Sequence, residues 1–335
     1  MGIIAAMTFD FDAAVNAPFR MQPGLRRVPA GSPQLTPMAP GARHQREKLA
    51  VLSAFWPQAL CVVPGFDAAP ALNALYQHAA QEHRHTWAWD GRHAQALQLG
   101  TAVQADGTVQ QATTGVFGGG DEVARCLQGL PPLWRQAGLA SLAFAEDFAI
   151  VDGSTGSIPW LAVALPSHWA PEDKVGRHFT EVHGPVADNE LLLKASAGLM
   201  KLVAGGAAST ERWERFVWNI TDQPRLHAHP AHGLEDGLDD GRSRRWQGCD
   251  ADQAWWRTER QTFLPVAGAA QAVFTIHVDV QPLAQAVNTA ARAVALRAAL
   301  ASMSPAVLAY RSLGTMRAPL MAWLQARARA LALTA

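Results

Sequence analysis

The clearest alternation of hydrophobic and polar positions lies in the second half of the chain. From Ala270 to Val280 every second residue is apolar, which is the period of a strand with one buried face. Two earlier segments, Trp213 to Thr221 and Trp255 to Leu264, alternate in a similar way. The pattern predicts three consecutive strands. The apolar side of the first consists of Phe216, Trp218 and Ile220.

A hairpin is predicted before these strands. Residues 141–150 form an extended apolar segment, residues 153–156 are typical of a turn, and residues 158–165 form a second apolar run. Residues 190–203 then have the composition of a helix that ends at Gly205-Gly206. The order is a hairpin, a helical insertion and three strands, without a βαβ rhythm. We therefore expect an α+β fold around a five-stranded antiparallel sheet.

The flanking regions have a different character. Residues 17–43 contain six prolines, which favours an extended arm on the surface. Helical spacing of apolar residues predicts helices over 45–56 and 70–81, whereas residues 98–114 are ambiguous. The tail after Pro282 is rich in Ala, Leu and Arg and predicts helices. We expect these helices to be interrupted at Ser304-Pro305, Gly314 and Pro319.

These segments define three expected regions. Residues 1–140 form an N-terminal arm and a helical region that packs on the core, residues 141–282 form the core, and residues 283–335 form C-terminal helices. Within the core, residues 226–252 are polar and glycine-rich and predict a long loop.

Composition narrows the classes of partner. Lysine plus arginine equals aspartate plus glutamate, 28 against 28, so no net field favours nucleic acid or an anionic membrane. No apolar run approaches the roughly 20 residues that span a bilayer. The three cysteines, Cys61, Cys126 and Cys249, are widely separated, which favours reduced thiols in a cytoplasmic protein. A small molecule is the expected partner.

Histidine spacing argues against a simple zinc site. His178 and His183 are five residues apart, so on a helix their directions differ by about 140°. A denser group, His227, His229 and His232, suits either a divalent ion or a solvated loop.

The segment from Leu165 to Val186 combines side chains that suit a haem. A haem has two carboxylates that pair with Lys or Arg, flat faces that pack on aromatic rings, and an iron that accepts a neutral imidazole. The segment supplies all three kinds: Trp169, Lys174, Arg177, Phe179 and His183. A histidine before Gly-Pro is also common as a turn or capping residue, so the spacing alone leaves both interpretations open.

The strand predicted over 255–264 carries charges on both of its faces. One face holds Arg257, Glu259 and Gln261, and the other holds Trp256, Thr258 and Arg260. Such a pattern suits either a solvated face or the wall of a pocket.

At these positions the chain resembles the haem-dependent oxidative N-demethylase family, which includes the large subunit of dimethylamine monooxygenase. The resemblance rests on motifs in the family's order between about residues 140 and 282, with a weaker likeness around Tyr310. The motifs are Glu146-Asp147-Phe148, Leu165-Pro-Ser-His-Trp169-Ala-Pro-Glu-Asp-Lys174-Val-Gly-Arg177, Val182-His183-Gly-Pro185-Val186, Arg257-Thr-Glu259-Arg260-Gln261-Thr262 and Phe274-Thr275-Ile276.

The resemblance implies a PAS-like domain that binds haem b, with His183 as the axial ligand. The cofactor-binding residues expected with it are Trp169, Lys174, Arg177, Arg257 and Arg260, of which Lys174 and Arg177 would hold the propionates. The expected catalytic residues are Trp218, Asn219 and Glu259. Where the family usually has Arg-x-Asn-Trp, this chain has Arg215-Phe-Val217-Trp218-Asn219, so its asparagine is displaced.

The implied reaction activates O₂ at the iron and oxidises an N-methyl carbon of a small secondary amine to a carbinolamine, which releases formaldehyde. The electrons would come from a separate flavin and iron–sulfur reductase. The displaced asparagine leaves the amine itself open. Two alternatives remain: a haem-binding PAS-like sensor without turnover, and a haem-free scaffold subunit.

Overall fold

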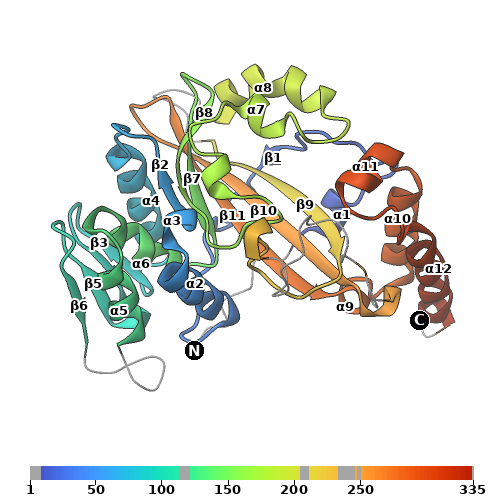
Figure 1. The fold of residues 1–335 in the computed structure, drawn as a ribbon, viewed down its shortest axis with the longest axis horizontal. Helices are drawn as coiled ribbons and strands as arrows, with labels where there is room; N and C mark the ends of the chain where they lie inside the picture. Colours follow the sequence, from blue (N-terminus) through green and yellow to red (C-terminus); the bar gives the residue numbers. More distant parts are fainter. Residues whose placement is uncertain (1–8, 113–120, 204–210, 233–245, 247–249, 334–335) are drawn as a thin grey trace.

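The computed structural model describes residues 9–112, 121–203, 211–232, 246 and 250–333. Its centre is an antiparallel seven-stranded sheet in the order β1-β9-β10-β11-β7-β8-β2 (Figure 1). The strands are β1 (Arg26–Arg27), β2 (Leu60–Val62), β7 (Asp147–Asp152), β8 (Ser157–Ala162), β9 (Trp213–Thr221), β10 (Trp255–Pro265) and β11 (Gln271–Pro282).

The five strands expected from the sequence lie side by side in the middle of this sheet. The sheet has seven strands rather than five because β1 and β2, both from the N-terminal region, pair with its two edges. The bounds of β9 agree with the prediction. The first hairpin strand begins later than predicted, at Asp147, because residues 135–143 form a helix. That helix is buried on all sides from Ala137 to Ala143, so its sequence shows no polar stripe.

A second, four-stranded sheet in the N-terminal region was not predicted. Its strands are β3 (Trp87–Trp89), β4 (Ala94–Ala96), β5 (Thr101–Val103) and β6 (Val109–Gln111), paired in that order. Each strand has three residues, which is too short to establish a period of two. The α+β class is confirmed, but the description of this region as an arm with helices was incomplete.

Twelve α-helices surround the two sheets in the described part of the chain. They are α1 (Phe11–Ala14), α2 (Arg43–Ala54), α3 (Trp56–Ala59), α4 (Ala69–Glu82), α5 (Glu122–Gly129), α6 (Arg135–Ala143), α7 (Phe179–His183), α8 (Glu190–Val203), α9 (Leu283–Ala286), α10 (Ala290–Ala301), α11 (Pro305–Tyr310) and α12 (Arg317–Leu333). None of the helices that the structure describes has the length and apolarity needed to cross a membrane.

Most of the predicted helices are confirmed. Helix α8 has the predicted bounds, and the C-terminal helices are interrupted near Ser304 and Gly314. The interruption expected at Pro319 was wrong. This proline lies in the first turn of α12, where its missing N–H group removes no helical hydrogen bond.

The proline-rich arm over residues 17–43 is largely irregular, as predicted, but its middle is not on the surface. Gln34 and Leu35 are each 1% exposed. The amide of Gln34 donates to the hydroxyl of Thr262 at 2.8 Å, so the arm is fixed against the central sheet.

The two faces of the central sheet have different coverings. Residues Phe179 of α7 and Met200 of α8 pack with Val151, Phe263 and Phe274, and we call this side the insertion face. Figure 1 shows α7 and α8 together beside the sheet, with the four-stranded sheet and α10–α12 at opposite ends of the molecule. We call the other side, which packs against the N- and C-terminal regions, the terminal face.

Strand register assigns each residue to one of these faces. On β9 and β10 the insertion face carries Arg215, Val217, Asn219, Arg257, Glu259 and Gln261. The terminal face carries Glu214, Trp218, Ile220, Trp256, Thr258, Arg260 and Thr262. Helices of the C-terminal region cover part of this second set, since Trp218, Ile220 and Trp256 pack in one cluster with Leu296 and Leu320. The arm covers Arg260 and Thr262 through Pro33 and Gln34.

Candidate functional site

His183 lies at the end of α7, beside the insertion face. The helix has only five residues, but a capping box stabilises its start: the ring of His178 accepts from Thr180 N, and Glu181 accepts from His178 N. At its end, Nδ1–H of His183 donates to the carbonyl oxygen of Phe179 at 2.9 Å. The local sequence thus fixes both the tautomer and the ring orientation.

The other ring nitrogen of His183 is available. Nε2 makes no hydrogen bond with a described residue. Burial lowers the pKa of His183 to about 4; the hydrogen bond to Phe179 opposes this shift, and nearby Arg215 and Lys174 add to it. At neutral pH the ring is therefore an uncharged imidazole whose Nε2 lone pair accepts no hydrogen bond from a described residue, which is the state that binds a metal.

Arg215 and Lys174 supply positive charge around this imidazole. Arg215 lies on the insertion face of β9, and Lys174 lies in the segment that leads into α7. Among the residues that the structure describes, the Lys174 ammonium group donates one hydrogen bond, a long one of 3.5 Å to Val182 O. Burial and the nearby Arg177 lower the pKa of Lys174.

Glu259 and Asn219 also lie on the insertion face. The register pairs Glu259 with Val217 and Asn219 with Arg257, so the two side chains are diagonal neighbours. Oε2 of Glu259 accepts from Gln261 at 2.6 Å, while Oε1 has no hydrogen-bond partner among the described residues. The structure brings these two predicted residues together, with one carboxylate oxygen available to a ligand.

Arg257 shares the same face but has a different role. It is 2% exposed, and its guanidinium donates to Ser167 Oγ at 2.8 Å and to Leu226 O at 2.8 Å. Further acceptors are the carbonyl oxygens of Leu165, Pro166 and Arg225. Arg257 therefore joins the segment before Trp169 to the segment after β9.

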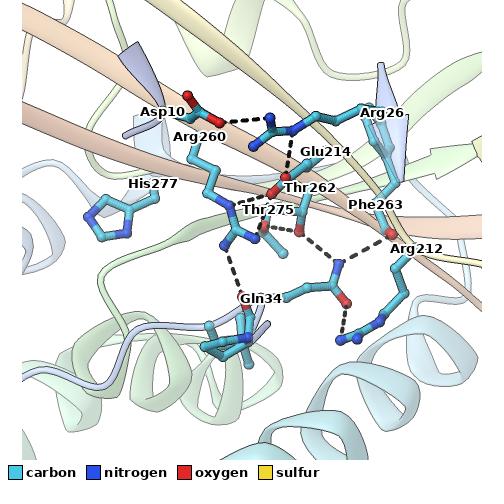
Figure 2. Close-up of polar contacts among 12 residues, drawn as sticks. Asp10, Arg26, Gln34, Arg212, Glu214, Arg260, Thr262, Phe263, Thr275 and His277 are labelled. Atoms are coloured by element: carbon cyan, nitrogen blue, oxygen red, sulfur yellow. Dashed lines mark hydrogen bonds and ion pairs between the residues drawn. The ribbon is translucent and has the colours of Figure 1, made fainter. Parts of the chain in front are cut away.

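Arg260 lies on the terminal face, away from His183. Figure 2 shows its guanidinium between Glu214 and the arm. It donates to Glu214 Oε2 from Nε at 2.8 Å and from Nη2 at 2.7 Å, and from Nη1 to Pro33 O at 3.0 Å. Glu214 also pairs with Arg26 at 2.8 Å. The structure does not bring Arg260 to the insertion face.

Trp218 also lies on the terminal face. Its ring stacks on Trp256 with centroids 5.0 Å apart, and its Nε1–H donates to Ala14 O at 3.0 Å. The guanidinium of Arg311 lies over the ring, 5.0 Å from the centroid. Neighbouring residues of a strand point to opposite faces, which separates Trp218 from Asn219.

Trp169 and Arg177 lie beside β8 rather than beside β9 and β10. Trp169 packs against Leu161 and Val163, and Arg177 is exposed beside the turn that precedes β8, where its carbonyl oxygen accepts from Ile158 N at 3.1 Å. Arg177 is close enough to Lys174 to lower the pKa of that lysine, and so belongs to the same positive region.

The second histidine group is arranged differently. Nδ1 of His227 donates to Ala164 O at 2.7 Å, and Nε2 of His229 lies 3.1 Å from both oxygens of Glu172. His232 contacts Gln58 Oε1 at 2.7 Å. Within the described residues, no group of three or more His, Cys, Asp or Glu side chains is arranged to hold a metal ion. Cys61 and Cys126 are free and buried, and Cys249 lies outside the described residues.

Sequence reasoning missed Arg215 as a site residue. The altered motif that contains Arg215 led to the prediction of Trp218 and Asn219 instead. The proximity of Arg215 to His183 depends on how α7 packs on the sheet. The strand pattern did contain a signal for Arg215, because a period of two places Arg215 on the same face of the sheet as Asn219.

These residues fit a haem. The porphyrin supplies four ligands to its iron, so one accessible neutral imidazole suffices from the protein, and cations beside it suit the two carboxylates. His183, Lys174 and Arg215 meet these needs, and the half-buried side chains of Val217 and Gln261 lie on the same face of the sheet.

The candidate site is thus an uncharged imidazole on a short helical insertion that covers one face of an antiparallel sheet. A family model, the haem-dependent oxidative N-demethylase alpha subunit-like family, matches residues 137–321, more than half of the 335 residues. The chain belongs to this family. A search of curated proteins gave no match.

Proposed function

We propose that this protein is a haem-dependent oxidative N-demethylase that acts on a small secondary amine. One observation carries the proposal: Nε2 of His183 has no hydrogen-bond partner among the described residues, while Nδ1 is held by Phe179 O. This is the arrangement of an imidazole prepared to ligate a metal.

We further propose that residues 141–282 form a PAS-like core that binds haem b, flanked by residues 1–140 and 283–335. The neighbour order β8-β7-β11-β10-β9, with α7 and α8 between β8 and β9 in the chain, supports this assignment. The α-subunit type of the family supports a partner subunit, and we place the flavin and iron–sulfur reductase outside this chain.

Haem, when bound, supplies reductive activation of O₂. The chain's own residues perform the remaining tasks. His183 presents a neutral nitrogen to the iron, and the carboxylate of Glu259 accepts a hydrogen bond from the amine N–H groups through Oε1. Asn219, its diagonal neighbour, orients the same substrate. The buried position of Glu259, 9% exposed, strengthens its attraction for a cationic amine.

The test is formaldehyde release. Haem-loaded protein, supplied with O₂, a chemical or enzymatic electron donor and a panel of secondary amines, is expected to release formaldehyde in proportion to amine consumed. A haem-loaded protein that releases none across the panel would instead be a sensor. Protein that cannot take up haem would be a scaffold subunit, and either result rejects the proposal.

A further inference from the structure

We propose that Arg215 is the principal anchor for a carboxylate of the bound porphyrin, with Lys174 as the second anchor. This inference rests on the proposed function, since it places a haem on His183. It gives a binding role to Arg215, the arginine of the altered Arg-x-Asn-Trp motif, whose role the family description does not state.

Arg215 has no hydrogen-bond acceptor among the described residues. Its Nε is buried without a hydrogen bond, and its terminal nitrogens make none with a described residue. A buried guanidinium donor without an acceptor is costly, and native interiors satisfy nearly all such groups. Nε of the half-buried Arg215 is thus a donor without an acceptor among these residues, and a ligand carboxylate would supply one.

The two arginines of the adjacent strand β10 are, in contrast, fully engaged by the protein. Arg257 donates to Ser167 and to four carbonyl oxygens, and Arg260 donates to Glu214 and Pro33. Arg215 lies one strand away, paired in register with Gln261, and makes no contact of this kind with the described residues. The surroundings of Arg215 leave its donors for a ligand.

The charges near Arg215 also favour an anionic ligand. Burial lowers the pKa of Arg215; Glu259 opposes this shift but forms no ion pair with it. Lys174 donates to Val182 O, next to His183, and Phe179 of α7 packs with Phe263, which pairs in register with Trp213, two residues before Arg215. Both cations therefore lie close to the helix that carries His183. Two cations around a neutral ligand nitrogen match a planar ligand that carries two carboxylates.

The experiment compares iron protoporphyrin IX with its dimethyl ester, in which both carboxylates are neutral. Binding of each is titrated by the Soret absorption of wild type, Arg215→Met and Arg215→Lys. Loss of one charge-assisted contact is expected to weaken the binding of Arg215→Met to the free acid by about 10- to 100-fold. Its binding to the ester should change by less than about twofold, and Arg215→Lys should recover part of the loss because it keeps the charge.

Two further variants complete the design. Arg125→Met removes an exposed arginine, 64% exposed in its side chain, and should bind both porphyrins as wild type does. Arg177→Met tests the competing anchor. If Arg215→Met lost equal affinity for the acid and the ester, Arg215 would only support the fold, and the inference would be overturned. An unchanged affinity of Arg215→Met for the acid, or a loss of affinity seen only in Arg177→Met, would also overturn it. Wild type that binds neither porphyrin would instead reject the proposed function.

Should Arg215→Met fold poorly, the ratio of acid to ester affinity in Arg215→Lys decides the question. A ratio equal to that of wild type would contradict an anchor whose forked geometry matters, whereas a lower ratio supports it. Thermal unfolding of each variant without porphyrin separates a loss of folding from a loss of binding.

Discussion

The ring of His183 lies over that of Phe179 with centroids 4.0 Å apart, while its Nδ1–H donates to the carbonyl oxygen of the same residue. One residue thus holds the imidazole by both its ring and its backbone. This double contact leaves only Nε2 for a ligand, and it orients that nitrogen without a side-chain hydrogen bond that a mutation could easily remove.

The first prediction follows from the position of Trp218 and Asn219 on opposite faces of the central sheet. Asn219→Ala should raise the KM for amine by about 10-fold with little effect on folding, because it removes one hydrogen bond at the substrate. Trp218→Phe should keep the KM and lower the free energy of unfolding, since it loses the bond to Ala14 O and part of the stack on Trp256. Steady-state kinetics and urea unfolding of both variants check this. The reverse result would place Trp218 in the site.

Arg257 should control the order of the segments that it joins. Arg257→Lys cannot reach all five acceptors and leaves buried carbonyl oxygens unsatisfied, so a loss of at least about 2 kcal/mol in the free energy of unfolding is expected. Hydrogen exchange should rise at residues 165–168 and 225–228 first. Uniform exchange across the sheet would contradict this local role.

Lys48 is a buried cation that connects α2 to the start of β7. Its Nζ lies 3.1 Å from Asp147 Oδ1, with both side chains at most 1% exposed, and Asp147 Oδ2 accepts from Leu165 N at 2.7 Å. Lys48→Met leaves Asp147 charged and unpaired, which should cost about 3–5 kcal/mol. The matched control is Lys194→Met, whose lysine is 77% exposed and whose loss should cost less than about 0.5 kcal/mol. Similar losses in both, measured by urea unfolding, would show that the buried pair contributes little.

Glu82 should govern part of the acid sensitivity of folding. Burial would raise its pKa, but the adjacent rings of His78 and His83 and the hydrogen bond that Glu82 accepts from Gln34 N outweigh burial and hold the pKa well below the usual 4.5. A carboxyl with a depressed folded pKa stabilises the fold fully above its unfolded pKa, and this stability disappears as the pH falls through and below about 4.5.

Glu82→Gln should therefore lower the free energy of unfolding by about 2–3 kcal/mol at pH 7, and by progressively less as the pH falls from about 4.5 toward about 2. Urea midpoints measured across this range provide the test. Asp121→Asn, at a side chain 58% exposed, should follow the wild-type pH dependence. If the free energies of unfolding of Glu82→Gln and wild type differed by the same amount at every pH, Glu82 would not be the source of this acid sensitivity.

The sequence predicted the central strands well because these strands are long enough for their period of two to be recognised. Strand β9 and helix α8 have the predicted bounds, since nine and fourteen residues span several repeats. The strands β3 to β6 span three residues each, and α6 is apolar on every side, so neither showed a readable period.

The candidate site was predictable as a set of residue types but not as a geometry. Period two alone separates Trp218 from Asn219, and Arg257 from Arg260, so the sequence itself assigns the members of each pair to opposite faces. The approach of Arg215 to His183 is not readable in this way, because it depends on the packing of α7 against a strand much later in the chain. The engagement of Arg257 by distant carbonyl oxygens is likewise a tertiary feature.

Ligation of iron by His183 is the central claim, and the absorption spectrum of the haem-loaded protein tests it most directly. Wild type is compared with His183→Ala and with His227→Ala, whose ring also donates from Nδ1 to a backbone carbonyl oxygen but whose Nε2 is buried. We predict that the Soret band shifts or disappears in His183→Ala, returns when imidazole is added, and stays as in wild type in His227→Ala. A Soret band in His183→Ala identical to that of wild type would contradict ligation by His183.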